Sequence, residues 1–315
     1  MRQISKGGRM QANGENSAEQ GSRIIRPILD ETPLRAASFI VTIYGDVVEP
    51  RGGAIWIGNL IEICAGVGIS ETLVRTAVSR LVAAGQLAGE REGRRSFYRL
   101  TDAARVEFAA AARVIFGPPE EASWHFVQLM GSSAEERMQM LERSGHARLG
   151  PRLAVGVRPF PSAIMPAVVF RAEPAQGASE LKAFASGCWD LGPHAQAYRR
   201  FLACFGKLAV LPDTARAIAP AECLSARLLM VHQFRFVTLR EPRLPAEILP
   251  ADWPGDEARR LFARLYRSLS PQADLHVARN CVTLTGPLPK ATGATEHRLR
   301  MLCGEAAPGK SGNPV

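Results

Sequence analysis

Apolar residues recur at helical spacing between residues 70 and 83. Val74, Ala77, Val78 and Leu81 share one side of a helix that begins after Ser70, a residue type favoured at helix N-caps. Three shorter stretches precede this helix. "NLIEICAG" is typical of a short helix and "GGAIWIG" of a short strand, whereas "SFIVTIYGDVV" fits either and is interpreted as a helix because of its position.

A β-hairpin is predicted directly after the amphipathic helix. Residues 87–100 read as two strands joined by a turn near Glu92-Gly93, and alternation directs Phe97 and Leu100 toward the core. An alanine-rich helix follows over residues 101–116, and "GPP" closes the region. Helix, turn, helix and hairpin, in this order, predict a winged helix-turn-helix domain.

The hydrophobic pattern changes beyond the "GPP" linker. Strand-like "SWHFVQLM" precedes a helix, "SSAEERMQMLERSG", which starts with an apparent capping box from Ser133 to Glu136. "RLAVGVRPF" and "AIMPAVVFRAE" are interpreted as strands, "ASELKAFAS" as a helix and "CWDL" as a last strand. This order predicts a ferredoxin-like βαββαβ domain.

The remaining sequence is mainly helical and completes an α+β architecture. Three helices are expected in "HAQAYRRFLACFG", "PAECLSARLLMVHQFRFVTLRE" and "DEARRLFARLYRSL", with a proline-rich connector before the last. The predicted boundaries are a disordered tail at 1–32, a winged helix-turn-helix domain at 33–117, a ferredoxin-like domain at 120–187, a C-terminal helical effector and dimerisation domain at 188–300 and a flexible tail at 301–315.

Charge and cysteine usage narrow the classes of partner and location. The 315 residues carry a formal net charge of +9, which favours a polyanionic partner such as nucleic acid. The six cysteines form no C-x-x-C pair, and no apolar run is long enough to span a bilayer. We expect a cytoplasmic protein with reduced thiols, no metal, no catalytic site and no membrane partner.

The polar side of the predicted helix carries candidate DNA contacts. Thr72, Arg75, Thr76 and Ser79 lie opposite the apolar side, and Arg80 flanks them. Such a stripe alone is typical of a solvated helix face. The hairpin favours DNA binding instead, because arginines near its turn can contact phosphates while the helix lies in the major groove. These arginines are Arg91, Arg94, Arg95 and Arg99.

Several segments resemble the PaaX family of repressors of phenylacetic acid catabolic operons. They are "YGDVVEPRGGAIWIG" (44–58), "VRTAVSRL" (74–81), "GRRSFYRLT" (93–101), "CWDLGPHAQAYRRF" (188–201) and "PRLPAEILPADWPG" (242–255). The resemblance covers about residues 34 to 270. It implies a homodimeric repressor that binds double-stranded operator DNA. Phenylacetyl-CoA or a related aryl-CoA thioester is expected to release the repressor from the DNA. The resemblance also places Tyr98 in the DNA-contacting hairpin.

The C-terminal block supplies candidate effector contacts. His232 and Arg235 match an H-x-x-R pattern of the family, although Gln233 replaces the usual acidic residue. Guanidinium groups can pair with the phosphates of CoA, and an aryl tail favours an apolar pocket. The candidate residues are Arg227, His232, Arg235, Arg240, Arg243 and Trp253. Ordinary ion pairs between domains would explain the same residues.

Two alternative functions stay open at this point. A ferredoxin-like domain resembling a CRISPR spacer-acquisition nuclease would fit a metal-dependent nuclease, but "SWHFVQLM" contains no carboxylate for a metal. The other alternative is a DNA-binding protein that responds to no effector.

Overall fold

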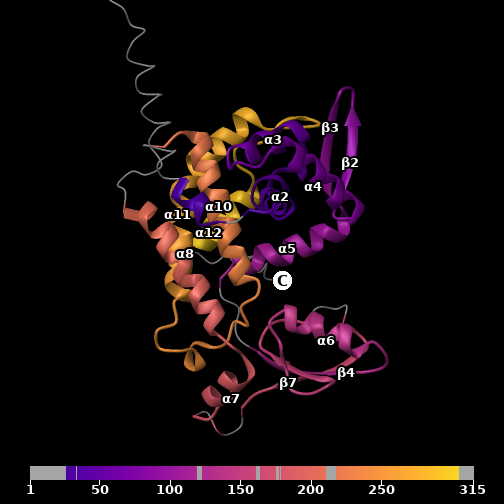
Figure 1. Ribbon diagram of the computed structural model, residues 1–315, viewed down its shortest axis with the longest axis vertical. Helices are drawn as coiled ribbons and strands as arrows, with labels where there is room; N and C mark the ends of the chain where they lie inside the picture. Colours follow the sequence, from indigo (N-terminus) through magenta and orange to yellow (C-terminus); the bar gives the residue numbers. More distant parts are fainter. Residues whose placement is uncertain are drawn as a thin grey trace, which may run out of the picture. The chain divides into compact units, whose positions relative to one another are not determined.

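The protein is of the α+β class, with mainly helical structure and small antiparallel sheets. The computed structural model describes residues 26–304 apart from 33, 119–122, 161–163, 175–176, 178 and 211–217 (Figure 1). The chain forms two compact units. The first contains Met1–Pro118, Phe201–Phe234 and Arg259–Val315, and the second contains Pro119–Arg200 and Arg235–Ala258. Among the described residues, the helices are too short or too polar to cross a membrane.

The N-terminal part of the first unit has the predicted order of helices and strands. Helix α2 (Ala36–Ile43) continues into a π-helical turn, η1 (Tyr44–Val48), and a 3-10 turn, η2 (Glu49–Arg51). The remaining elements are β1 (Ala54–Trp56), α3 (Ile57–Ala65), α4 (Glu71–Ala83), β2 (Leu87–Glu92), β3 (Arg95–Leu100) and α5 (Asp102–Phe116). The interpretation of "SFIVTIYGDVV" as helical is therefore confirmed.

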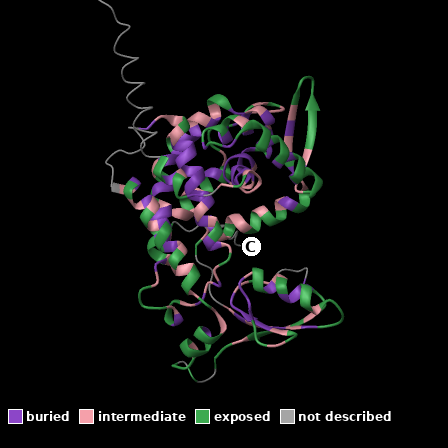
Figure 2. Cartoon of the chain, in the orientation of Figure 1, coloured by how far each residue is buried: buried purple, intermediate pink, exposed green. Residues whose placement is uncertain are grey.

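Strand β3 lies between β1 and β2 in an antiparallel sheet. The hairpin register runs from Leu87 opposite Leu100 to Glu92 opposite Arg95. Gly93 in the turn has φ 57°, a left-handed conformation that glycine adopts without a Cβ penalty. Phe97 and Leu100 are buried, as predicted, whereas the distal hairpin is exposed (Figure 2). The hairpin is thus anchored at its base and free along its tip.

The C-terminal helices also contribute to the first unit. They are parts of α8 (Gly192–Val210), α10 (Pro220–Thr238) and α11 (Gly255–Asn280), followed by β8 (Val282–Thr283), β9 (Gly286–Pro287) and α12 (Gly293–Leu302). Phe234 and Phe262 stack with ring centroids 4.2 Å apart. Arg259 donates to the carbonyl oxygens of Gly117 and Val114. Residues 188–300, the predicted C-terminal helical domain, are thus divided between the two units, and the parts in the first unit pack on the N-terminal helices.

The second unit contains a four-stranded antiparallel sheet in the order β5-β6-β4-β7. Its elements are β4 (Trp124–Leu129), α6 (Ala134–Arg143), β5 (Ala147–Arg148), β6 (Leu153–Gly156), β7 (Ala167–Ala172), α7 (Leu181–Cys188) and the 3-10 turn η4 (Ala246–Ile248). One face of the sheet packs on Met138 and Leu141 of α6, and the other packs on Ala185 of α7 and Ile248.

The predicted βαββαβ order lacks its last strand and gains a short additional strand, β5. Helix α7 follows β7 as predicted, but the residues after Cys188 in "CWDL" form no strand. Trp189 instead packs its ring near Trp124 and donates from Nε1 to the Gly145 carbonyl oxygen at 3.0 Å. Through these side-chain contacts, the segment after α7 covers part of the sheet.

The capping box predicted at Ser133 is also absent. Ser133 has φ 59° and makes no side-chain cap hydrogen bond. Arg137 is buried and donates to five carbonyl oxygens, those of Met130, Ser132, Ser133, Ile164 and Pro166. A buried guanidinium thus satisfies loop carbonyl groups around the start of α6.

The end of the predicted disordered tail is structured. Residues 26–30 are helical, Ile28 is buried, and the Thr32 hydroxyl donates to the Ile28 carbonyl oxygen at 2.6 Å. Thr32 also accepts a hydrogen bond from Gln233. Composition alone predicted disorder for residues 26–32 because it does not show that Ile28 is buried. Residues 1–25 and 305–315 of the predicted tails lie outside the described residues.

Candidate nucleic-acid interface

Helix α4 has one buried apolar face and one exposed polar face. Val74, Ala77, Val78 and Leu81 are buried, as the helical spacing predicted. The five candidate DNA contacts on this helix are all exposed; they are Thr72, Arg75, Thr76, Ser79 and Arg80. Ser70 occupies the N-cap position, although its side chain makes no cap hydrogen bond. The polar face of α4 is therefore available to a partner outside the first unit.

The hairpin is held against the helices by a tyrosine pair. The buried Tyr44 of η1 donates from its hydroxyl to the Tyr98 carbonyl oxygen of β3 at 3.0 Å. Burial, and then the neighbouring Tyr98, raises the pKa of Tyr44 well above its usual range. The half-buried Tyr98 ring also lies against Gly89, where a Cβ atom would approach the ring to 3.0 Å. Sequence reasoning assigned Tyr98 to DNA contact and missed this anchoring.

The predicted hairpin arginines form an exposed cationic surface. Arg91, Arg94, Arg95 and Arg99 are all exposed. The Arg95 guanidinium lies over the Trp56 ring at 5.0 Å, and Arg91 donates from Nε to the Gly93 carbonyl oxygen. Sequence reasoning missed Trp56, whose partner comes from another strand. These contacts order the side chains without neutralising their charge.

An ion pair lies on the exposed face of α4. Glu71 and Arg75 approach to 2.8 Å, and both side chains are more than half exposed. Exposed pairs of this kind contribute little to stability. Glu71 was also missed, although its spacing of four residues from Arg75 is a signal for such a pair. The pair holds the Arg75 guanidinium near the first turn of the helix.

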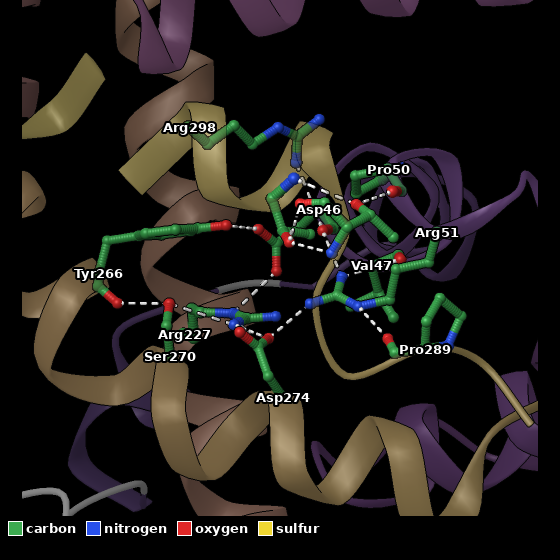
Figure 3. A network of polar contacts seen from close by, with 12 residues as sticks. Asp46, Val47, Pro50, Arg51, Arg227, Tyr266, Ser270, Asp274, Pro289 and Arg298 are labelled. Atoms are coloured by element: carbon green, nitrogen blue, oxygen red, sulfur yellow. Dashed lines mark hydrogen bonds and ion pairs between the residues drawn. The ribbon is translucent and has the colours of Figure 1, made fainter. Parts of the chain in front are cut away.

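A buried ionic network joins the N-terminal helices to the C-terminal helices (Figure 3). Arg227 of α10 donates to Asp46 at 2.9 Å and to Asp274 of α11 at 2.6 Å. Arg51 shares the same Asp274 oxygen at 2.6 Å. Tyr266 donates from its hydroxyl to Asp46 at 2.8 Å. We name these five residues the Asp46 network.

The Asp46 network has balanced charges, two guanidinium groups and two carboxylates. Burial opposes the charge of Arg227, but Asp46 first, then Tyr266 and Asp274, raise its pKa above the usual range. Arg51 extends the network by donating to the carbonyl oxygens of Val47 and Pro289. Segments distant in the sequence are thereby fixed on the turn that follows α2.

A second polar contact joins the same helices. His232 of α10 is buried, and its Nδ1 lies 2.8 Å from the Thr42 hydroxyl of α2. Its ring also meets the Phe39 ring edge-on, with centroids 5.5 Å apart. Two of the six candidate effector residues, Arg227 and His232, are thus buried structural contacts of the first unit. For Arg227, ion pairing is the reading that the structure supports.

The other four candidate effector residues belong to the second unit. Arg235 and Arg240 lie over the Phe236 ring at 4.8 and 5.7 Å. Burial first, and then Arg240, lowers the pKa of Arg235 to about 10. Arg243 adopts φ 59°, and the half-buried Trp253 meets Tyr198 edge-on. Across the described parts of both units, His, Cys, Asp and Glu side chains nowhere gather in a group that could hold a metal ion.

The comparisons with known proteins point to one family. The model of the PaaX-like protein family matches residues 35–104, and that of the PaaX-like protein C-terminal domain matches residues 189–279. Transcriptional repressor PaaX from Escherichia coli (strain K12) is 30% identical over 284 residues, which cover 84% of this chain and 90% of that protein. A solved structure, uncharacterized protein Rv0674 from Mycobacterium tuberculosis, matches with 22% identity and a TM-score of 0.46, covering 77% of this chain and 99% of its own. The resemblance found in the sequence is confirmed: the chain belongs to the PaaX family.

Proposed function

We propose that this protein is a transcriptional repressor whose first unit binds double-stranded operator DNA as a winged helix-turn-helix. The observation that carries the proposal is the exposed polar face of α4 beside the cationic β2–β3 hairpin, with the apolar face of α4 buried. An α-helix fits the major groove, and arginine can pair there with guanine. The arginines of the hairpin reach the adjacent phosphates. The relative that bears the name transcriptional repressor supports this function.

Membership of the family supports proposals for the regulated genes, the oligomer and the location. We propose repression of an operon for phenylacetic acid catabolism by a cytoplasmic homodimer. A two-fold dimer would place its two α4 helices about 34 Å apart, which is one turn of DNA. The family assignment also favours a regulator over an enzyme.

An aryl-CoA thioester is the proposed effector. In the second unit, Arg235 and Arg240 present two guanidinium groups around one aromatic ring, and Arg243 and Trp253 belong to the same unit. Arginine pairs well with phosphate, and CoA carries several phosphate oxygens. The thioester would release DNA only by binding the DNA-free state more tightly than the bound state.

A negative charge introduced on α4 tests the DNA-binding function. Bound duplexes are first selected from a random DNA pool, and the affinity of the full chain for the selected operator is measured by fluorescence anisotropy. Ser79→Glu places a carboxylate on the exposed face of α4, so binding should fall at least tenfold because it repels phosphate. Ser186→Glu on α7 makes the same chemical change at another exposed serine and should leave affinity unchanged.

Titration with phenylacetyl-CoA then tests the effector. Phenylacetyl-CoA should release the operator at concentrations where CoA alone does not. Equal DNA binding by the two serine variants would refute the assignment of α4. Operator binding that is insensitive to every aryl-CoA would favour the effector-independent alternative.

A further inference from the structure

Leu73 is an exposed apolar residue in the first turn of α4. Its side chain is 56% exposed and lies at the edge of the polar face, beside the exposed Thr76. Leu73 is not needed for the core, because Val74 and Ala77 supply the buried face at this level of the helix. Thr76 follows at i+3, so its methyl group lies on the same side as Leu73. The first turn of α4 therefore carries a small exposed apolar spot.

The surroundings of this spot indicate the chemistry of its partner. Arg75 and Arg80 are exposed on the same helix, and the hairpin adds further guanidinium groups. An exposed apolar group on a surface that also carries positive charge suits a polyanion that also offers apolar groups. Double-stranded DNA combines both, since thymine presents a C5 methyl group in the major groove and the other three bases do not.

We infer that Leu73 is a specificity-determining residue that contacts the C5 methyl group of a thymine in each operator half-site. This inference rests on the proposed function. Residues in the first turn of a recognition helix are the ones that reach base edges. Leu73 excludes water from the thymine methyl, and Thr76 extends the apolar contact. The guanidinium of Arg75 is left to read a neighbouring base.

The test removes one methyl group from the DNA. In the operator selected from random duplexes, each thymine is replaced singly by deoxyuridine, and affinities of wild type and Leu73→Ala are measured. For wild type, one thymine position in each half-site should show roughly a fourfold loss, as expected for burial of one methyl-sized group. Leu73→Ala should bind the thymine and deoxyuridine duplexes equally. Alanine favours helix, so this variant should fold.

Val82→Ala is the matched control. Val82 is 39% exposed on α4 and lies nine residues beyond Leu73, about 13 Å along the helix. This variant should keep the wild-type response to deoxyuridine. If the two alanine variants respond as wild type does, or no thymine is sensitive, the inference is overturned while DNA binding stands. If wild type selects no sequence at all, the proposed function and the inference both fail.

Discussion

Replacement of Arg227 by methionine should destabilise the first unit strongly. Arg227→Met removes the partner of Asp46, whose side chain is fully buried, and among the described residues the Tyr266 hydroxyl is then the side-chain donor left to its carboxylate. Two carboxylates then face one guanidinium, that of Arg51. Removing one member of a buried ion pair costs about 3–5 kcal/mol, because a buried charge loses its compensation.

A second substitution should recover much of this loss. Asp46→Asn in the Arg227→Met background removes the uncompensated charge but keeps an oxygen acceptor for Tyr266. The remaining Arg51–Asp274 pair, at 2.6 Å, is balanced. We expect the double variant to be more stable than Arg227→Met by about 2 kcal/mol, since neutral replacements of buried pairs are often tolerated.

Urea unfolding of the full chain, followed by circular dichroism, measures these free energies. The matched control is Arg75→Met, because Arg75 pairs with Glu71 at the solvent-exposed surface. Its free energy of unfolding should fall by no more than about 1 kcal/mol. Equal losses for Arg75→Met and Arg227→Met would refute the role assigned to the Asp46 network. So would additivity of the Arg227 and Asp46 effects, since groups in contact should couple.

Two further predictions concern DNA and pH. Arg75→Ala should reduce discrimination between operator and random duplexes by about 1–3 kcal/mol. Arg94→Ala should weaken binding to both duplexes and lower the slope of log affinity against log salt concentration by about 1. Equal losses of selectivity in the two variants would contradict this division of roles. Burial first, then Arg158 and His125, lowers the pKa of His146 to about 4. Because the unfolded value is about 6.5, stability should fall by up to about 3 kcal/mol between pH 6.5 and 4, and unfolding of His146→Gln should lack this dependence.

Local patterns predicted the candidate interface well. The buried and exposed faces of α4 follow from a 3.6-residue period, which depends only on neighbours along the helix. The hairpin turn followed from Gly93, where a left-handed conformation is needed. Both features can be read from fewer than fifteen consecutive residues.

Contacts between distant segments could not be predicted in this way. Asp46 and Arg227 are 181 residues apart, and neither stands out from the other charged residues of the sequence. Arg227 was therefore assigned to a ligand. The prediction of a last strand at "CWDL" was wrong, because this segment packs through the side chain of Trp189 and its apolar pattern resembles a short strand. In both cases the outcome depended on tertiary contacts that local sequence does not contain.

The Asp46 network has a consequence for how the repressor is made. A nascent chain that has left the ribosome only as far as Pro118 carries α4 and the hairpin, but Asp46 still lacks Arg227, and Arg51 lacks Asp274. Its proposed DNA-binding surface therefore awaits residues translated more than one hundred codons later. Truncated products of interrupted translation should consequently not compete with finished molecules for the operator.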